Sequence, residues 1–269
     1  MHCDGFDTST RGTRRSVSKD GHPSVRDLVS RLSVPPHPGV FRADDCVGLP
    51  PGAVRYLRAS IAPGARHARA ARLAMRGSIR LGSRWLPFRA TEVIAPHEGF
   101  VWAARVAGLV TGADSFADGA GRTAFSLAGV IPLAHEAGPD VDRSAAGRAG
   151  AEAVWVPTAL LPGAGVAWDE AESGELRAQF EVAGEPTELA LRILPSGHLS
   201  SVSLARWGDP QGTGDHGWHR FGLDVTGYGQ AHGITFPAAG RVGWLTPAAD
   251  LSGGEFFRFR VTSYAPIGD

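Results

Sequence analysis

The sequence has almost no lysine, little cysteine, no net charge and no long apolar run. Lys19 is the only lysine among 27 basic residues, and 27 acidic residues bring the formal net charge to zero. A neutral chain has no overall field that would draw it to nucleic acid or to an anionic membrane. No window reaches the apolar length of a membrane-spanning helix. We therefore expect no nucleic-acid partner and no membrane insertion.

The two cysteines, Cys3 and Cys46, both lie near the N-terminus. Two thiols form neither a disulfide framework nor a cysteine-based metal site, and lone thiols are typical of a reducing compartment. Residues 13–17 are similar to the start of a twin-arginine export signal, but no apolar run follows them. The sequence therefore predicts a cytoplasmic protein.

Glycine, proline and apolar residues are present in the proportions of a globular protein with many turns. The 269 residues include 36 Gly and 19 Pro, and 43% are hydrophobic. We expect a poorly ordered segment over 1–47 that contains one short helix, followed by a single domain over 48–269. The helix would begin after a capping Ser24 and place Val25, Leu28 and Leu32 on one face.

From residue 72 onward, apolar residues recur at every second position, which is typical of strands with one wet face. One face of the first strand would carry Leu73, Met75, Ile79 and Leu81, and the other Arg72, Arg76, Ser78 and Arg80. Short connections, including the turn signal Asp118-Gly119, predict antiparallel pairing, because parallel neighbours need long crossovers. The pattern predicts about ten strands, over residues 72–81, 85–94, 100–106, 122–130, 176–182, 187–194, 199–207, 221–228, 234–236, 241–245 and 255–264.

The stretch from Arg143 to Asp169 separates two runs of strands and has the composition of a substantial helix. We predict a helix over Ser144 to Leu161 that lies in or across the concave face of a single, strongly curved antiparallel sheet. The fold class is thus mainly β, with short N-terminal helices. Glu152 and Trp155 are three positions apart and share one helix face, and Pro157 should bend or end the helix.

Several short sequence motifs are more specific to a protein family than the amino-acid composition is. They are LP and RYL within Leu49–Leu57, RWLPFRA (Arg84–Ala90), EAVWVPTALLP (Glu152–Pro162), RWGDP (Arg206–Pro210) and GEFFRF (Gly254–Phe259). Together they resemble a bacterial family known as a domain of unknown function, over about 49–264. The layout is also similar to the half-barrel of lipoprotein-localisation proteins, which hold acyl chains in the concavity. That resemblance implies a half-barrel, although those carriers are exported and we expect no export signal here.

Glu152 has two interpretations. A carboxylate beside an indole in an apolar groove would have a raised pKa and could anchor a ligand or act as a general acid. Alternatively, Glu152 forms a structural ion pair with a strand arginine such as Arg105 or Arg206. The seven tryptophans likewise either line a cavity for an apolar ligand or pack the core.

The Gly-rich stretch Gly208 to Gly217 is predicted to be a loop. Asp215, His216 and His219 in and beside it could ligate zinc, but a solvated loop is the simpler interpretation. The loop formally matches a dinucleotide-binding fingerprint without the strand and helix which that motif needs, and no Gly-x-Ser-x-Gly elbow occurs. We predict no metal and no cofactor.

The resulting hypothesis is binding of a small hydrophobic molecule, such as a lipid, polyketide or terpenoid, between helix and sheet. The predicted ligand-binding residues are Trp102, Glu152, Trp155, Arg206 and Trp207. The alternative is an acid–base enzyme, an isomerase, cyclase or hydrolase, that uses Glu152 with Asp169 or Glu255 as its partner. A structural or interaction protein with a solid core is a third possibility.

Overall fold

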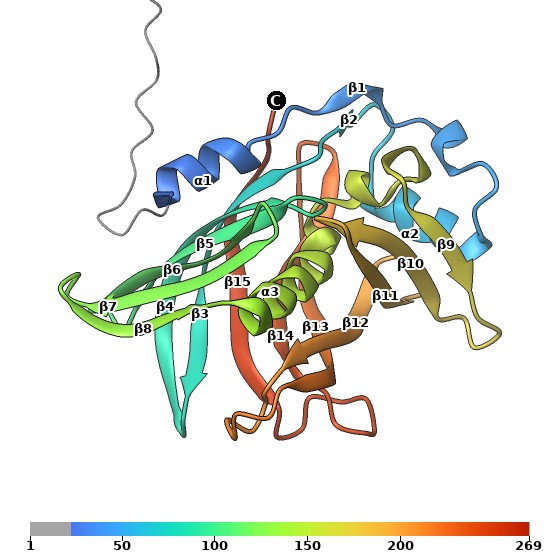
Figure 1. Cartoon of the computed structure of the whole chain (residues 1–269). Helices are drawn as coiled ribbons and strands as arrows, with labels where there is room; N and C mark the ends of the chain where they lie inside the picture. Colours follow the sequence, from blue (N-terminus) through green and yellow to red (C-terminus); the bar gives the residue numbers. More distant parts are fainter. Residues whose placement is uncertain (1–22, 269) are drawn as a thin grey trace, which may run out of the picture.

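Two runs of antiparallel strands form one sheet, and a single helix joins their outer ends (Figure 1). The structure is a computed structural model that describes residues 23–268. The first run consists of β3 (Ala71–Leu81), β4 (Arg84–Ala95), β5 (Gly99–Val106), β6 (Val110–Ala117), β7 (Ala120–Leu127) and β8 (Ile131–Ala137). The second run consists of β9 (Ala167–Glu170), β10 (Leu176–Val182), β11 (Glu185–Ile193), β12 (Leu199–Gly208), β13 (Gly217–Ala231), β14 (Ile234–Trp244) and β15 (Glu255–Pro266).

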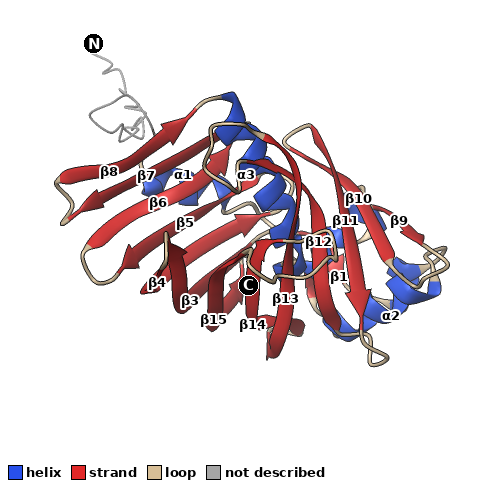
Figure 2. Ribbon diagram, turned by 90° about the horizontal axis from the view of Figure 1, so that it is seen from below, coloured by secondary structure: helices blue, strands red, loops and turns tan. Residues whose placement is uncertain are grey.

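The two runs meet in the middle of the sheet, where β3 pairs with β15. The order across the 13-stranded sheet is β8-β7-β6-β5-β4-β3-β15-β14-β13-β12-β11-β10-β9. Tight hairpins connect most neighbours. Asp118 and Gly119, with φ of 54° and 76°, form the turn between β6 and β7, as the Asp-Gly signal predicts. The sheet is strongly curved (Figure 2), so it has a concave and a convex face.

The helix α3 (Pro139–Ala151) crosses the concave face and connects β8 to β9. Pro139 stands at its first turn, where a missing N–H costs no hydrogen bond. Its buried residues are all small: Ala145, Ala146, Ala149 and Gly150. A Cβ at Gly121 of β7 would lie 2.6 Å from the carbonyl oxygen of Val141. Small residues on both sides therefore let the helix lie directly on the strands.

Three short 3-10 turns follow α3 and fill one end of the concavity. They are η2 (Glu152–Trp155), η3 (Pro157–Leu160) and η4 (Pro162–Ala164), and all residues of the first two are buried. Val156 leaves the helical region with φ of −128° and ψ of 66°, as expected before Pro157. The prediction of one helix over Ser144 to Leu161 is therefore wrong in its bounds: the α-helix begins earlier and ends at Ala151.

The N-terminal elements pack around the sheet. They are α1 (Val25–Leu32), β1 (His37–Val40), η1 (Ala43–Cys46), α2 (Pro51–Ser60) and β2 (Arg66–His67). The predicted cap is confirmed, because Ser24 and Asp27 form a reciprocal capping box. Leu32 of α1 packs with Val93 and Val101, which alternate with the cavity-facing Glu92 and Trp102, so α1 covers the convex face. α2 buries Tyr56 and Leu57 in the main core.

The mainly β fold with a helix on the concave face is confirmed, whereas the strand count of about ten is wrong. β6, β8 and β9 were not expected, and the predicted strands 234–236 and 241–245 are one continuous β14. The division at residue 47 stays a prediction. Residues 1–22 of the predicted N-terminal segment lie outside the described residues.

Candidate functional site

A cavity of about 490 Å³ lies between α3 and the inner face of the sheet. Apolar side chains from both runs of strands form most of its wall, among them Met75, Ile79, Trp102, Phe125, Phe221 and Phe257. Polar groups gather on the helix side: Glu92, Asp114, Arg148, Glu152 and Arg206. Leu81 and Leu133 also line it and are 52% and 56% exposed. The cavity therefore opens toward solvent near the strand ends that carry these two leucines.

Arg148 of α3 is the centre of the polar group. Its Nη2 donates to Glu92 Oε1 at 2.9 Å, its Nη1 to Asp114 Oδ2 at 2.5 Å and its Nε to Glu152 Oε1 at 2.6 Å. The guanidinium carbon also lies 4.1 Å from the ring centre of Phe100. One cation thus links the helix to β4 and β6 and uses all three of its nitrogens.

Burial controls the protonation of the two glutamates. Loss of water raises the pKa of the Glu92 carboxyl well above its ordinary value, repulsion from Glu152 adds to this, and Arg148 opposes it. Burial also raises the pKa of Glu152, again opposed by Arg148. For Arg148 itself burial acts to lower the pKa, but the surrounding carboxylates outweigh it and the pKa is raised. Glu92 and Glu152 can therefore hold a proton next to a permanent cation.

Arg206 of β12 is a second, half-buried cation that lines the cavity. Its Nε donates to the carbonyl oxygen of Ser144 at 2.9 Å, and its guanidinium lies 4.6 Å from the ring centre of Phe221. Burial lowers its pKa to about 10, and the nearby Arg148 acts in the same direction. The two guanidinium groups lie near three carboxyl groups, those of Glu92, Asp114 and Glu152, and a proton held by one of the two glutamates would balance the charge of the cluster.

Two polar atoms of the cavity lining have no partner within the described chain. Trp102 Nε1 and Glu152 Oε2 are buried and form no hydrogen bond. Trp155 provides the contrast, since its Nε1 donates to the carbonyl oxygen of Pro237 at 2.8 Å. An indole N–H that donates and a carboxyl oxygen that accepts are groups to which a molecule in the cavity could bind.

Four of the five predicted ligand-binding residues line the cavity, namely Trp102, Glu152, Trp155 and Arg206. Trp207 does not: its Nε1 donates to Asp140 Oδ1 at 2.8 Å, and its ring packs against Trp218. Glu152 pairs with an arginine, but this is Arg148 of the preceding helical turn rather than Arg105 or Arg206.

The proposed catalytic partners of Glu152 lie elsewhere. Asp169 is exposed on β9, and Glu255 pairs with Arg258 at 2.5 Å. The carboxylates that do converge on Glu152 are Glu92 and Asp114. Any acid–base partner of Glu152 in this cavity would therefore be Glu92 or Asp114, neither of which the sequence predicted.

The sequence did not predict Glu92, Asp114 and Arg148, although a signal pointed to two of them. Arg148 precedes Glu152 by four positions, the spacing at which helical side chains pair. Glu92 occupies a position of β4 that its two-residue alternation assigns to the apolar face, where a carboxylate requires a partner. Asp114 carried no such signal, because β6 has no clear apolar alternation.

The histidine-containing loop is not part of this site. Asp209 organises it, since its carboxylate accepts the backbone N–H groups of Gln211, Gly212 and Gly214. His216 is exposed. Within residues 23–268, no three His, Cys, Asp or Glu side chains are arranged to hold a metal ion. Over the same residues, no helix has both the length and the apolar character needed to cross a bilayer.

The fold and the cavity define a class of protein: a strongly curved antiparallel sheet with a helix over its concave face and a cavity between them. Within this class the chain belongs to a family of unknown function, DUF6544, whose profile matches residues 39–256. The resemblance to a bacterial domain of unknown function is thereby confirmed. The half-barrel that the sequence resemblance implied is also the fold of this structure.

Three solved structures are similar to this chain. A DUF1329 family protein from Desulfovibrio piger has 11% identity and a TM-score of 0.41, over 80% of this chain and 90% of that one. An outer membrane lipoprotein-sorting protein domain from Vibrio parahaemolyticus has 8% identity and a TM-score of 0.39, over 73% and 84%. A LolA superfamily protein from Nitrosomonas europaea has 6% identity and a TM-score of 0.40, over 79% and 90%. No curated protein matches the chain.

Proposed function

We propose that the protein binds one small, mostly hydrophobic molecule with a polar end in the cavity beneath α3. The observation that carries the proposal is the combination of an apolar cavity of about 490 Å³ with two unpartnered polar atoms on its wall. Such a volume is within the range of small-molecule sites, which are mainly apolar with a few oriented polar groups.

The polar end of the ligand would lie against α3. Trp102 Nε1 offers a hydrogen-bond donor and Glu152 Oε2 an acceptor or, when protonated, a donor. A hydroxyl group can accept from Trp102 Nε1 and donate to Glu152, and a carbonyl group can accept from Trp102 Nε1 and from a protonated Glu152. A free carboxylate would instead be repelled by Asp114 and Glu152. We therefore favour a neutral polar group over an acid. Lipids, polyketides and terpenoids with a hydroxyl or ketone fit this description.

Native mass spectrometry of protein purified from its own host tests the proposal. We expect a bound apolar molecule that is lost when the cavity is filled by Val110→Trp. Thr111→Trp is the matched control, because Thr111 is the next residue of β6 and does not line the cavity. Protein that carries no adduct from host extract, and that takes up no apolar ligand from a lipid mixture, would contradict the proposal.

An acid–base enzyme is the second candidate, favoured by one observation. Glu92 and Glu152 both have raised pKa values and share Arg148. Two coupled carboxyl groups of this kind can hold a proton at neutral pH and exchange it with a ligand. Conversion of the co-purified molecule on incubation, abolished by Glu152→Gln, would identify an enzyme. If the co-purified molecule is unchanged after incubation, the protein only binds it.

A cytoplasmic location remains part of the proposal. Cys46 is buried and free, which is compatible with a reducing compartment. We likewise retain residues 48–269 as the ligand-binding domain, with the preceding segment outside it. Expression of residues 48–269 alone, followed by the same mass measurement, tests that division.

A further inference from the structure

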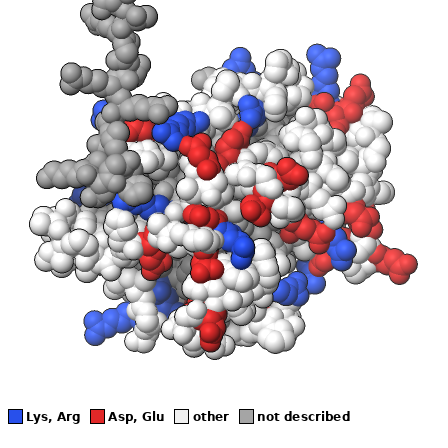
Figure 3. Space-filling model, in the orientation of Figure 1, with Lys and Arg blue, Asp and Glu red and all other residues white. Residues whose placement is uncertain are grey.

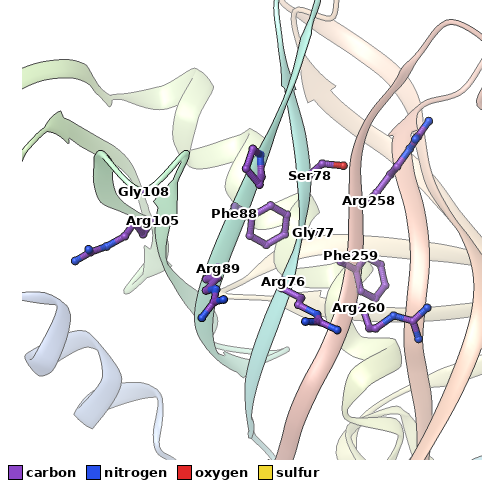
Figure 4. A pocket seen from close by; sticks show the side chains of 11 residues that line it. Arg76, Gly77, Ser78, Phe88, Arg89, Arg105, Gly108, Arg258, Phe259 and Arg260 are labelled. Atoms are coloured by element: carbon purple, nitrogen blue, oxygen red, sulfur yellow. The ribbon is translucent and has the colours of Figure 1, made fainter.

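The convex face of the sheet carries a row of four arginines. Arg260 of β15 stands directly opposite Arg76 of β3, Arg76 opposite Arg89 of β4, and Arg89 opposite Arg105 of β5. Figure 4 shows these side chains projecting from neighbouring strands. Strands lie about 4.8 Å apart, so the row extends over roughly 14 Å. All four residues are exposed.

Within the part of the chain that the structure describes, no acidic side chain neutralises this row. The only acidic residues of β3, β4, β5 and β15 are Glu92, which lines the cavity on the other face, and Glu255, which pairs with Arg258. Over residues 23–268, none of the four guanidinium groups forms an ion pair.

Such an arrangement opposes folding. Like charges directly opposite each other on neighbouring strands repel, and here three consecutive cross-strand pairs are Arg–Arg. Glutamine or threonine at any of these positions would keep the strand and remove the repulsion. Because the guanidinium groups gain no ion pair within residues 23–268, their charge is available to an anionic partner.

The side of the molecule that carries α3 has a different charge pattern. In Figure 3 acidic side chains are spread over the middle of this side, and basic ones lie mostly toward the margins. The arginine row is therefore a local basic patch on a chain whose formal net charge is zero. A local patch can orient a neutral protein at a charged surface.

We propose that this arginine row docks the convex face on the surface of an anionic phospholipid bilayer. Arg76, Arg89 and Arg105 border a shallow, open depression with Ser78 and Gly108 rather than a closed pocket. A broad basic surface without a deep groove suits headgroup phosphates spread over a plane. A protein partner would be expected to meet exposed aromatic anchors, but the nearby Trp85 is covered by Arg258, 4.3 Å from its ring centre.

Docking is by charge and does not require insertion. Guanidinium groups bind phosphate oxygens in a bidentate manner, which lysine cannot do. Attraction to anionic lipid falls off within a Debye length, about 10 Å at 0.1 M salt. Bound protein should therefore be released by salt. The proposal goes beyond ligand binding in the cavity and does not depend on it, since empty protein would dock as well.

The test is flotation of the full chain with vesicles of phosphatidylcholine, with and without phosphatidylglycerol. We expect binding only to the anionic vesicles at low salt. The triple variant Arg76→Gln, Arg89→Gln, Arg105→Gln should reduce the partition coefficient by about a hundredfold, from roughly a fivefold loss for each arginine. Its midpoint of thermal unfolding should equal or exceed that of the wild type, because repulsion is removed.

The control is a second triple variant with the same loss of charge, Arg55→Gln, Arg192→Gln, Arg220→Gln, whose residues are exposed on α2, β11 and β13. It should bind the anionic vesicles nearly as well as the wild type. Equal loss in both triples, equal binding to neutral vesicles, or a convex-face triple that unfolds would overturn the proposal. So would tighter binding to a short DNA duplex than to the vesicles. None of these outcomes affects the cavity.

Discussion

Arg148 on the helix and Glu92 on β4 lie 56 positions apart in the sequence and are joined by a 2.9 Å hydrogen bond. The Glu92 side chain is only 1% exposed and that of Arg148 17%. The pair attaches the helix to the first run of strands, while Arg206 attaches it to the second through the Ser144 carbonyl. Both attachments are also part of the cavity wall, so the position of the helix and the shape of the cavity depend on the same side chains.

Removal of the Arg148 charge should be strongly destabilising. Arg148→Met keeps the length of the side chain but leaves Glu92 and Glu152 buried without their cation. We expect a loss of about 3 to 5 kcal/mol in the free energy of unfolding, measured by urea denaturation. Arg143→Met, on the exposed side of the same helix, should cost well under half of that. A similar loss in both variants would contradict the role assigned to Arg148.

Glu92 should make stability depend on pH. Its pKa is raised in the folded protein, so the folded state holds a proton that the unfolded state has released once the pH passes the ordinary glutamate value. This contribution is therefore present at low pH and is lost as the pH rises through the folded pKa. Glu92→Gln mimics the protonated form and should gain stability relative to the wild type as the pH rises above the ordinary pKa of glutamate. Glu185 lies at the exposed start of β11. Glu185→Gln should therefore show the same pH dependence of the free energy of unfolding as the wild type.

Trp102 and Trp155 should respond differently to replacement by phenylalanine. Trp155→Phe leaves the buried carbonyl oxygen of Pro237 without its donor and should cost about 1 to 3 kcal/mol. Trp102→Phe removes an N–H that has no partner, so the unfolding free energy of ligand-free protein should change less. The same variant should bind the co-purified molecule more weakly. Unchanged ligand affinity in Trp102→Phe would show that the indole N–H is not used.

Gly121 should resist even the smallest side chain. A Cβ there would lie 2.6 Å from the Val141 carbonyl oxygen and 3.0 Å from Ala145 Cβ. Gly121→Ala must push α3 away from β7, and we expect a loss of about 1 to 3 kcal/mol in thermal or urea unfolding. A Cβ at Gly163 meets no atom within 4 Å, so Gly163→Ala should be neutral or slightly stabilising.

The sequence predicted those elements whose signal is local. Alternation identified β3, β4 and β5, and the Ser24 cap and the Asp118-Gly119 turn followed from short-range chemistry. β8 was missed because it is an edge strand with no buried residue, so its sequence has no strong apolar alternation. The end of α3 was misplaced since helical composition continues past Ala151, whereas the backbone tightens into 3-10 turns before Pro157.

The site was predicted only in part for a similar reason. Glu152, Trp155, Trp102 and Arg206 were recognised by residue type, and the structure brings them to one cavity. Their partners depend on long-range packing: Arg148 meets Asp114 across 34 positions. Net charge concealed the arginine row as well, because a total of zero contains no information on which face each charge occupies.

The pairing of β3 with β15 has a consequence for how the protein is made. Thr262 donates to the Ala74 carbonyl oxygen 188 residues earlier, so the central seam of the sheet cannot close until β15 has left the ribosome. Until then β3 is an unprotected edge, and half of the apolar wall that later encloses the cavity faces water. Closure of such distant contacts is slow. We therefore expect the first run of strands to be exposed to aggregation until β15 pairs with β3.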